Sequence, residues 1–332
     1  MTGVAGTSST RSRWRSAASW RDLFRDRPMI PLLVLLVLLV AASDIVRPGI
    51  VAPAWAGIIL RAAVPLAILG GCQTLTMLTG GIDLSVSAVA SMSGFVVASL
   101  AINTGTPLAI VIALIAAALA GLVTGIGVGV FRVHPLIMTL GMSLVVLGMA
   151  NFWQLQTIQT SVGVPPVLRW LGSQAFADVV PYDLLVFVPL AALTLIGLRR
   201  TGYGRLLYAV GDNPVAARLS GARSWQIIVG LYIVSALLAA IAGFLYAGYT
   251  NVASVSLVDS ALLPSVAAAV IGGTSIMGGR GGYGGTMVGA LILTVISSLL
   301  ASMGYPEAVN QILFGAIIVV VAAAYTRVTS ES

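Results

Sequence analysis

The sequence predicts an all-α protein that crosses a membrane about ten times, with its helices arranged in two inverted halves of five. Of the 332 residues, 58% are hydrophobic and only 8% are charged, whereas soluble domains carry about 25% charged residues. Apolar runs recur to the end of the chain, and most are near the length of about 20 residues that a helix needs to cross hydrocarbon. The arginines gather in the tails and in alternate loops between these runs.

The apolar runs place the expected helices in order along the chain. The sixth run is short, and the third and eighth adjoin glycine-rich stretches, so either of these two could be broken or re-entrant. The expected spans are 29–46, 57–78, 84–102, 107–130, 136–155, 183–198, 226–249, 259–276, 286–302 and 309–325.

The segments around the spans define the predicted domains. Residues 1–28 carry six arginines and are predicted to be a basic cytoplasmic tail. They are not read as a signal peptide, because no small-residue cleavage site follows the first apolar run. Residues 29–325 form the predicted transmembrane domain, 199–224 its long cytoplasmic loop, and 326–332 a short cytoplasmic C-terminal tail.

The arginine distribution predicts the orientation. If the N-terminus is cytoplasmic and the spans alternate, 14 of the 17 arginines lie on the cytoplasmic side. Only Arg47, Arg61 and Arg169 fall outside. This is the bias that the positive-inside rule describes. The sequence therefore predicts a multi-pass protein of the bacterial inner (plasma) membrane with both termini in the cytoplasm.

Glycine and proline positions suggest an internal repeat. Each predicted half has small residues at four-residue spacing and a proline near the start of its last span. Because each half has an odd number of spans, the two halves would be inverted relative to each other. The alternative is chance, since glycine and proline are frequent in membrane helices. The residues concerned are Gly121, Gly125, Gly129 and Pro135 in the first half, and Gly281, Gly285, Gly289 and Pro306 in the second.

The residue inventory excludes several classes of function. The 17 basic residues are all arginine, and without a lysine the chain has neither a Walker A site nor a Schiff-base lysine. Cys72 is the one cysteine and His134 the one histidine, which excludes an intrachain disulfide and any site with two histidine ligands. We expect no metal, no cofactor and no catalytic residue. The net charge of +7 indicates contact with membrane lipid rather than nucleic acid.

The first motif is the segment 79–87, with the sequence TGGIDLSVS. Gly80 and Gly81 break one helix, and Asp83 or Ser85 can cap the start of the next. One interpretation makes the segment a hinge or a group near a translocation path, because a carboxylate close to hydrocarbon is costly. The other makes it an N-cap at the cytoplasmic membrane surface, where water and helix N–H groups satisfy the charge.

The second motif lies in the long loop and predicts a short, capped helix over 213–221. Asn213 is a typical N-cap, Pro214 suits the first helical position and Gly221 suits the left-handed position after the helix. A helix of two turns is not stable alone in water, so it must dock on its own membrane domain, on lipid or on a partner. The alternative is a plain surface connector. The helix residues singled out are Asn213, Pro214, Ala216, Ala217, Arg218, Leu219, Ser220 and Gly221.

A third glycine-rich stretch covers 271–285, and we expect Gly272, Gly273 and Thr274 to form a hinge or to line the path. Its formal G-x-G-x-x-G pattern lacks the preceding strand that nucleotide-binding folds need. Within the spans, Gln73 and Asn151 either line a path for a hydroxylated solute or hold helices together.

These stretches together resemble the sugar-importer permeases of the ABC superfamily, the branch that includes the ribose permease. The segment 80–86, GGIDLSV, is similar to that family's SGIDLSV, and 268–275, AAVIGGTS, is similar to its AAVVLGGTS. Gly204-Arg205, 209–211 and 217–221 resemble its cytoplasmic loop, and 132–141 resembles another shared stretch. The likeness runs from about residue 30 to 325 in the same order.

The resemblance implies a permease subunit that is not itself an enzyme. It implies ten helices, pairing with a second copy or a paralogue, two ABC ATPase subunits docked beneath, and a periplasmic or lipid-anchored solute-binding protein. The ATPase-docking helix of such permeases would map onto 213–221. Where ribose-like members often carry Tyr-Glu-Leu-Asp, this chain has Ala261-Leu262-Leu263-Pro264.

The expected function is ATP-driven import of a monosaccharide, a pentose or hexose, or of a similar small hydroxylated solute. One alternative is an ABC permease for branched-chain amino acids or for a furanosyl signalling molecule. Another is an ion-coupled secondary transporter, although such proteins usually keep carboxylates or histidines within the membrane. An intramembrane enzyme would want paired catalytic acids or a metal site, and the sequence is poor in both.

Overall fold

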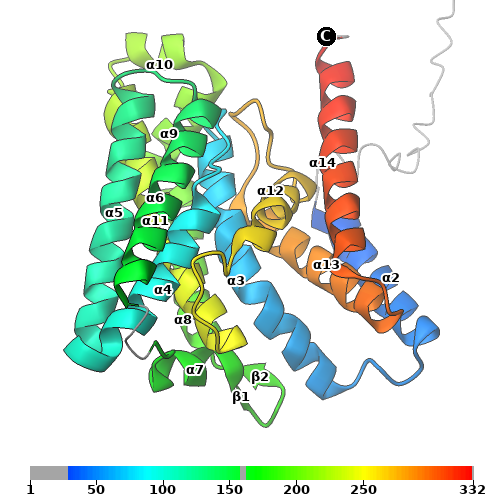
Figure 1. The fold of residues 1–332 in the computed structure, drawn as a ribbon. Coiled ribbons are helices and arrows are strands. Elements are labelled where there is room, and N and C mark those ends of the chain that lie inside the picture. The colour runs from blue at the N-terminus through cyan, green and yellow to red at the C-terminus, as the bar shows by residue number, and fades with distance from the viewer. Residues whose placement is uncertain (1–28, 158–161, 331–332) are drawn as a thin grey trace, which may run out of the picture.

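The computed structural model describes residues 29–157 and 162–330. The expected basic tail over 1–28 and the last two residues of the expected C-terminal tail lie outside this part of the chain. Helices make up almost all of its regular structure (Figure 1). The first part of the chain forms α2 (Met29–Val46), α3 (Pro53–Met77), α4 (Val86–Thr104), α5 (Thr106–Gly129) and α6 (Pro135–Thr157).

The second part begins with shorter elements. A short helix and an antiparallel pair of two-residue strands precede α8, and this hairpin was not expected from the sequence. These elements are α7 (Pro166–Ser173), β1 (Ala175–Phe176) and β2 (Val180–Pro181). The chain continues as α8 (Leu184–Arg200), α9 (Gly202–Asp212), α10 (Pro214–Leu219), α11 (Ser224–Thr250), the 3₁₀ turn η1 (Asp259–Ala261), α12 (Leu262–Ile271), α13 (Tyr283–Ser302) and α14 (Glu307–Ser330).

The predicted fold class is confirmed as an all-α polytopic membrane protein. In the described residues, seven helices are long and apolar enough to cross a membrane, or eight if the bent pair α8 and α9 forms one span. These two helices meet at 66°. The apolar segment 259–271 is shorter than a full crossing, whereas α14 extends over 24 residues as far as Ser330. The count of ten crossings therefore stays a prediction.

The eighth expected span, 259–276, differs most from the structure. Its helix ends at Ile271, and an irregular loop follows as far as Gly282. The helix stops because Gly272 and Gly273 come directly after it, and the backbone N–H of Thr274 turns back to the carbonyl of Ala269. The expected span 259–276 is therefore broken after Ile271, which is one of the forms that its adjoining glycines predict.

Helix α3 lies at the centre of the molecule, where α4, α11, α12 and α13 pack around it (Figure 1). Every residue of α3 from Ala63 to Met77 is buried. By contrast, α6 leaves large apolar side chains such as Ile137 and Leu144 exposed, at 68% and 64%. Such surfaces are covered by lipid or by another membrane subunit.

The glycines at four-residue spacing serve close helix packing. A methyl group at Gly121, Gly125 or Gly129 of α5 would meet the backbone of α11 within 3.0 Å. Gly289 of α13 lies equally close to the backbone of Ala268 in α12, and Gly285 lies against Gly272, which directly follows α12. Small residues let membrane helices approach at backbone distance, so the two glycine stripes fix the pairs α5–α11 and α12–α13.

The connecting segments sort to two ends of the molecule. Helix α10 and the C-terminal end of α14 lie at one end, and α7 with the β1–β2 hairpin lies at the other (Figure 1). Arg218 and Arg223 accompany α10, whereas Arg169 belongs to α7. This arrangement agrees with the alternation of loops on which the arginine count depends.

Candidate functional site

Residues 79–85 form a tight turn between α3 and α4, which we call the buried turn. The turn begins where Gly80 adopts a φ of +77°, a conformation that glycine enters without steric cost. The backbone N–H of Gly80 bonds the carbonyl of Met77, and that of Gly81 bonds the carbonyl of Thr76. These bonds close the end of α3 and direct the chain back toward the protein interior.

Asp83 is buried in this turn, with only 3% of its surface exposed. Its Oδ1 accepts hydrogen bonds from the backbone N–H of Ser85 at 2.9 Å and from the Ser85 hydroxyl at 2.6 Å. Its Oδ2 accepts a bond from the Ser235 hydroxyl of α11 at 3.3 Å. The carboxylate therefore accepts a backbone N–H at the start of α4, as the N-cap interpretation expected, but it is buried rather than exposed to water. Its assignment to a hinge or a translocation path stays a prediction. Ser85 holds the N-cap position of α4 but makes no side-chain cap bond.

Two polar side chains from neighbouring helices hold the backbone of the buried turn. Gln73 of α3 donates from Nε2 to the carbonyl of Asp83 at 2.8 Å, and its Oε1 accepts from the Asp83 N–H at 3.3 Å. Thr139 of α6 donates to the carbonyl of Ile82 and accepts from the N–H of Leu84. The turn is thus tied to α3, α6 and α11, and Gln73 is used inside the chain.

Sequence reasoning missed Thr139 and Ser235 as members of this cluster. Both are isolated hydroxyl residues within apolar helices, and both are fully buried. A lone serine or threonine in such a helix usually bonds its own backbone, so nothing in the local sequence distinguishes these two. Asn151, which was singled out, lies exposed on α6 and bonds the carbonyl of Leu147.

The loop after α12 contains Gly272, Gly273 and Thr274. Gly272 packs against the backbone of Gly285 and Thr286 at the start of α13, where a methyl group would overlap. Thr274 is 3% exposed, and its hydroxyl has no hydrogen-bond partner in the described part of the chain. Gly272 therefore lies at a tight helix contact, whereas a methyl group at Gly273 would meet nothing within 4 Å. The assignment of the three residues to a hinge or path stays a prediction.

Backbone from three distant segments meets at what we call the glycine junction, formed by Leu78, Gly80, Gly211, Gly278 and Gly279. The N–H of Gly279 bonds the carbonyl of Leu78 at 3.0 Å. Gly211 of α9 lies against the carbonyl of Leu78, and Gly278 lies against the carbonyl of Gly211. The junction joins the end of α3, the loop before α13 and the helix that leads directly into α10.

The capped helix predicted in the long loop is present as α10. The Asn213 side chain accepts bonds from the N–H groups of Val215 and Ala216 at 3.0 and 2.9 Å. Gly221 has a φ of +87°, and its N–H bonds the carbonyl of Arg218 while that of Ala222 bonds Ala217. These two bonds form a Schellman motif, so both predicted caps are confirmed.

Helix α10 presents one buried face and one exposed face. Ala217 is 7% exposed and packs on the chain itself. Leu219 and Val215 are 85% and 57% exposed, and Arg218 is exposed between them. A short helix with two large apolar side chains in water is typical of a surface that another protein covers.

A cavity of about 330 Å³ lies beside α10, where that helix meets α5, α9 and α11. Its wall contains Arg132, Arg218 and Arg223 and no acidic residue. In the part of the chain that the structure describes, these arginines have no ion-pair partner. The surface around α10 is therefore both apolar and positively charged. No group of three possible metal ligands occurs among the described residues.

Comparisons with known proteins cover almost the whole chain. A family model described as "Branched-chain amino acid transport system / permease component" matches residues 56–322. The fructose import permease of Rhizobium meliloti is 33% identical over 305 residues, covering 89% of this chain and 84% of that protein. The galactofuranose transporter permease of Escherichia coli K12 is 33% identical over 265 residues, covering 79% of this chain and 77% of that protein. The ribose import permease of Bacillus subtilis is 30% identical over 291 residues, covering 87% and 90%. No solved structure matches the chain.

Proposed function

The chain belongs to the ribose-permease-like family of sugar ABC importer permeases, and we propose that it is the membrane-spanning subunit of an ATP-driven monosaccharide importer. The solute would be a pentose, a hexose or a similar small hydroxylated molecule. The observation that carries this proposal is the likeness over most of the chain to permeases named for fructose, galactofuranose and ribose. ATP hydrolysis would take place on a separate subunit.

Two further assemblies follow from this function. A solute-binding protein, periplasmic or lipid-anchored, would deliver the sugar to the face that carries α7 and the hairpin. A second copy of the chain, or a paralogue, would pair with it in the membrane. The exposed apolar side chains of α6 provide a surface that such a partner or lipid would cover.

We propose ten crossings in two inverted halves for the assembled transporter. The short segment 259–271 would complete a crossing together with its flanking loops, and α14 would cross along its own length. The packed glycine stripes of α5 and α13, each followed by a proline at the start of the next helix, support the pairing of the halves. Alternating access in transporters commonly uses repeats of this kind.

We assign α10 as the helix through which the ATPase acts. Its exposed Leu219 and the charge of Arg218 offer a partner both apolar and ionic contact. Its connection through α9 to the glycine junction gives a rigid route to α3 and the buried turn. Under this proposal, Asp83 and its hydrogen-bond partners move as one unit when the ATPase subunits close.

Energy coupling tests the proposed function directly. We expect cells that express the permease with its ATPase and binding protein to take up a radiolabelled monosaccharide. Uptake should survive a protonophore and should stop when the ATPase is omitted, because ATP rather than an ion gradient drives the transport. Uptake that is abolished by the protonophore and unchanged when the ATPase is omitted would instead indicate the ion-coupled alternative.

The proposed orientation predicts a labelling pattern for single cysteines in a Cys72→Ala background. Ser173→Cys lies in α7 and should react with an impermeant thiol reagent added to intact cells. Ser220→Cys follows α10 and should react only after the cells are permeabilised, because the arginine-rich end is cytoplasmic. Labelling of Ser220→Cys from outside would invert the orientation and with it the ATPase assignment.

A further inference from the structure

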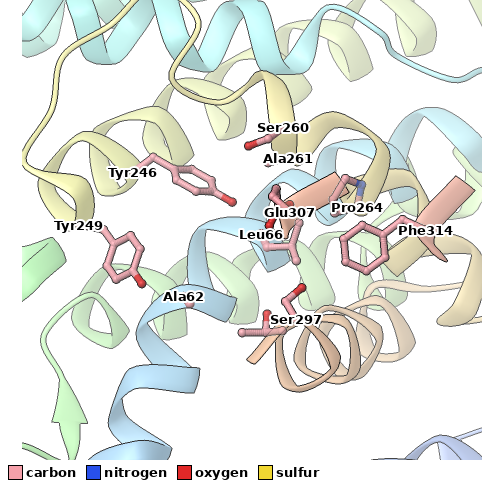
Figure 2. Close-up of a pocket in the computed structure, with 11 residues that line it drawn as sticks. Ala62, Leu66, Tyr246, Tyr249, Ser260, Ala261, Pro264, Ser297, Glu307 and Phe314 are labelled. Carbon is pink, nitrogen blue, oxygen red and sulfur yellow. The ribbon is translucent and has the colours of Figure 1, made fainter. Parts of the chain in front are cut away.

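A cavity of about 170 Å³ lies between the last turns of α11 and the start of α14, and we call it the outer pocket (Figure 2). Its walls come from α3, α11, η1, α12, α13 and α14. Gly172 of α7 packs against the backbone of Tyr249, so the pocket lies beside the face proposed to meet the binding protein. Drug-sized ligands occupy pockets of roughly 300–1,000 Å³, so this one suits a smaller solute.

The outer pocket is lined by hydroxyl groups that the chain itself does not use. In the described part of the chain, the hydroxyls of Tyr246, Tyr249, Ser260 and Ser297 have no hydrogen-bond partner. The hydroxyl of Thr294, which also lines the pocket, instead bonds the carbonyl of Ala290 in its own helix. Hydroxyls left without a partner at a cavity wall are available to water or to a ligand.

Glu307 contributes the one charged group of the pocket. The side chain of Asn310 donates to its Oε2 at 2.9 Å and so fixes the carboxylate in the first turn of α14. The second carboxylate oxygen has no bond to any described residue. An ionised carboxylate only accepts hydrogen bonds, and bonds to it are roughly twice as strong as neutral ones.

No basic residue lines the pocket, so Glu307 would repel an anionic solute. This excludes a good fit for phosphorylated sugars. It also disfavours free amino acids, whose carboxylate would find no cation here. A neutral solute with several O–H donors satisfies both the carboxylate and the surrounding hydroxyls.

Aromatic rings supply the remaining walls of the pocket. Figure 2 shows Tyr246 and Phe314 on opposite sides of Glu307 and Leu66, with the Tyr246 hydroxyl directed toward the middle. Phe314 is 3% exposed and therefore held firmly in place. The flat apolar rings suit the C–H face of a sugar, and the Tyr246 hydroxyl suits its polar rim.

We propose that the outer pocket binds a neutral monosaccharide, with Glu307 accepting two of its hydroxyls and Tyr246 and Phe314 packing on its ring. The site would receive the solute before it passes the centre of the membrane. The proposal rests on the proposed transport function, because it assigns the substrate class and an entry site for that function.

Protection of a cysteine tests this site without the need for transport. Ser260→Cys would be placed in the Cys72→Ala permease, expressed with its ATPase subunits in spheroplasts and labelled with an impermeant maleimide. D-fructose, D-ribose and D-galactose serve as probes, up to about 100 mM, roughly a hundred times the upper end of usual KM values. With at least one sugar the labelling rate should fall by the factor 1 + [sugar]/Kd, about fivefold at four times Kd.

Matched variants control this measurement. Ser256→Cys lies in the exposed loop before η1, outside the pocket, and should label at the same rate with and without sugar. In the double variant Ser260→Cys/Glu307→Gln, the Kd of the sugar obtained from protection should rise about tenfold, because a neutral amide replaces the charged acceptor. Uptake assays on the same variant should show a raised KM with ATPase binding unchanged.

Three outcomes would overturn the proposal. The first is that no sugar slows the labelling of Ser260→Cys, and the second is that L-leucine protects it equally well. The third is that Ser260→Cys never reacts although Ser256→Cys does, which would mean that a partner subunit or lipid covers the pocket. Protection in a protein that shows no ATP-driven uptake would sustain the site and reject the transport function, so the two proposals fail separately.

Discussion

Replacing Gly221 by valine should abolish sugar uptake while leaving the permease in the membrane. Gly221 has a φ of +87°, and a left-handed backbone costs other residues about 1–2 kcal/mol, with more for a β-branched side chain. No atom lies within 4 Å of the position where its Cβ would be, so the substitution acts through the backbone alone. We expect the Schellman bonds of α10 to break and uptake to fall at least tenfold.

Arg218→Glu should give the same loss by a different route. Arg218 is exposed beside Leu219 and has no acidic partner in the described residues. Its reversal removes only an exposed bond from its Nε to the carbonyl of Pro214, so we expect the fold to persist. Placing like charges opposite each other at an interface costs several kcal/mol, which weakens ATPase docking by about thirtyfold or more. The measurement is co-purification of the ATPase together with uptake in vesicles.

Two glycine variants distinguish a loss of ATPase coupling through α10 from the effect of backbone strain in general. Gly221→Asn should retain most uptake, because asparagine tolerates the left-handed conformation after a helix. Gly304→Val places the same strain at the opposite end of the molecule, where φ is +80° and the space is also open. We expect ATPase binding to survive in that variant. Normal uptake and normal ATPase binding in both Gly221→Val and Arg218→Glu would make α10 a plain connector.

Helix α10 could be predicted in detail because its determinants are local. The cap, the proline and the terminal glycine all lie within nine residues, and each acts on neighbouring backbone groups. The helix positions were likewise predictable, since composition along the chain decides where hydrocarbon-spanning helices form. The ends at 271 and 283 were not, because a glycine-rich stretch breaks a helix at any of several places.

The environment of Asp83 could not be predicted for the opposite reason. Its partner Ser235 lies 152 residues away, and the two braces Gln73 and Thr139 come from different helices. Local sequence indicated a helix start, for which water is the usual partner of a carboxylate. Tertiary packing placed the side chain in the interior instead, where buried polar groups need partners from the protein.

The outer pocket could not be predicted from the sequence either. Its residues come from six elements, and no two of its polar side chains form a recognisable motif. The sequence comparison with ribose-like permeases did single out the stretch 261–264 as unusual. Ala261 and Pro264 of that stretch line the pocket. A departure at these positions is therefore a departure at the proposed sugar site.

The glycine junction explains how motion of α10 would reach the membrane helices. Gly211 is the next-to-last residue of α9, two positions before the cap of α10. It lies in backbone contact with Leu78 and Gly279, and Leu78 directly follows α3 and precedes the buried turn. Rigid backbone contacts of this kind transmit displacement because packed interiors compress very little.

Gly211→Ala should therefore have the largest effect of any methyl addition in the loop region. The new methyl group would overlap the backbone carbonyl of Leu78 and lie 2.8 Å from the N of Gly279, and neither atom can move by a rotamer change. Overpacking costs about 1–3 kcal/mol when side chains can adjust and more when they cannot, so we expect a destabilisation of about 3 kcal/mol or more. The thermal unfolding temperature of the purified complex and its uptake rate should both fall.

Gly197→Ala in α8 is the matched control, because its Cβ meets nothing within 4 Å and alanine favours a helix by about 0.5–1 kcal/mol. If the Gly211→Ala complex is as stable as the Gly197→Ala complex and takes up sugar as fast, the backbone at the glycine junction accommodates a methyl group without strain. Coupling between α10 and the buried turn would then follow another route.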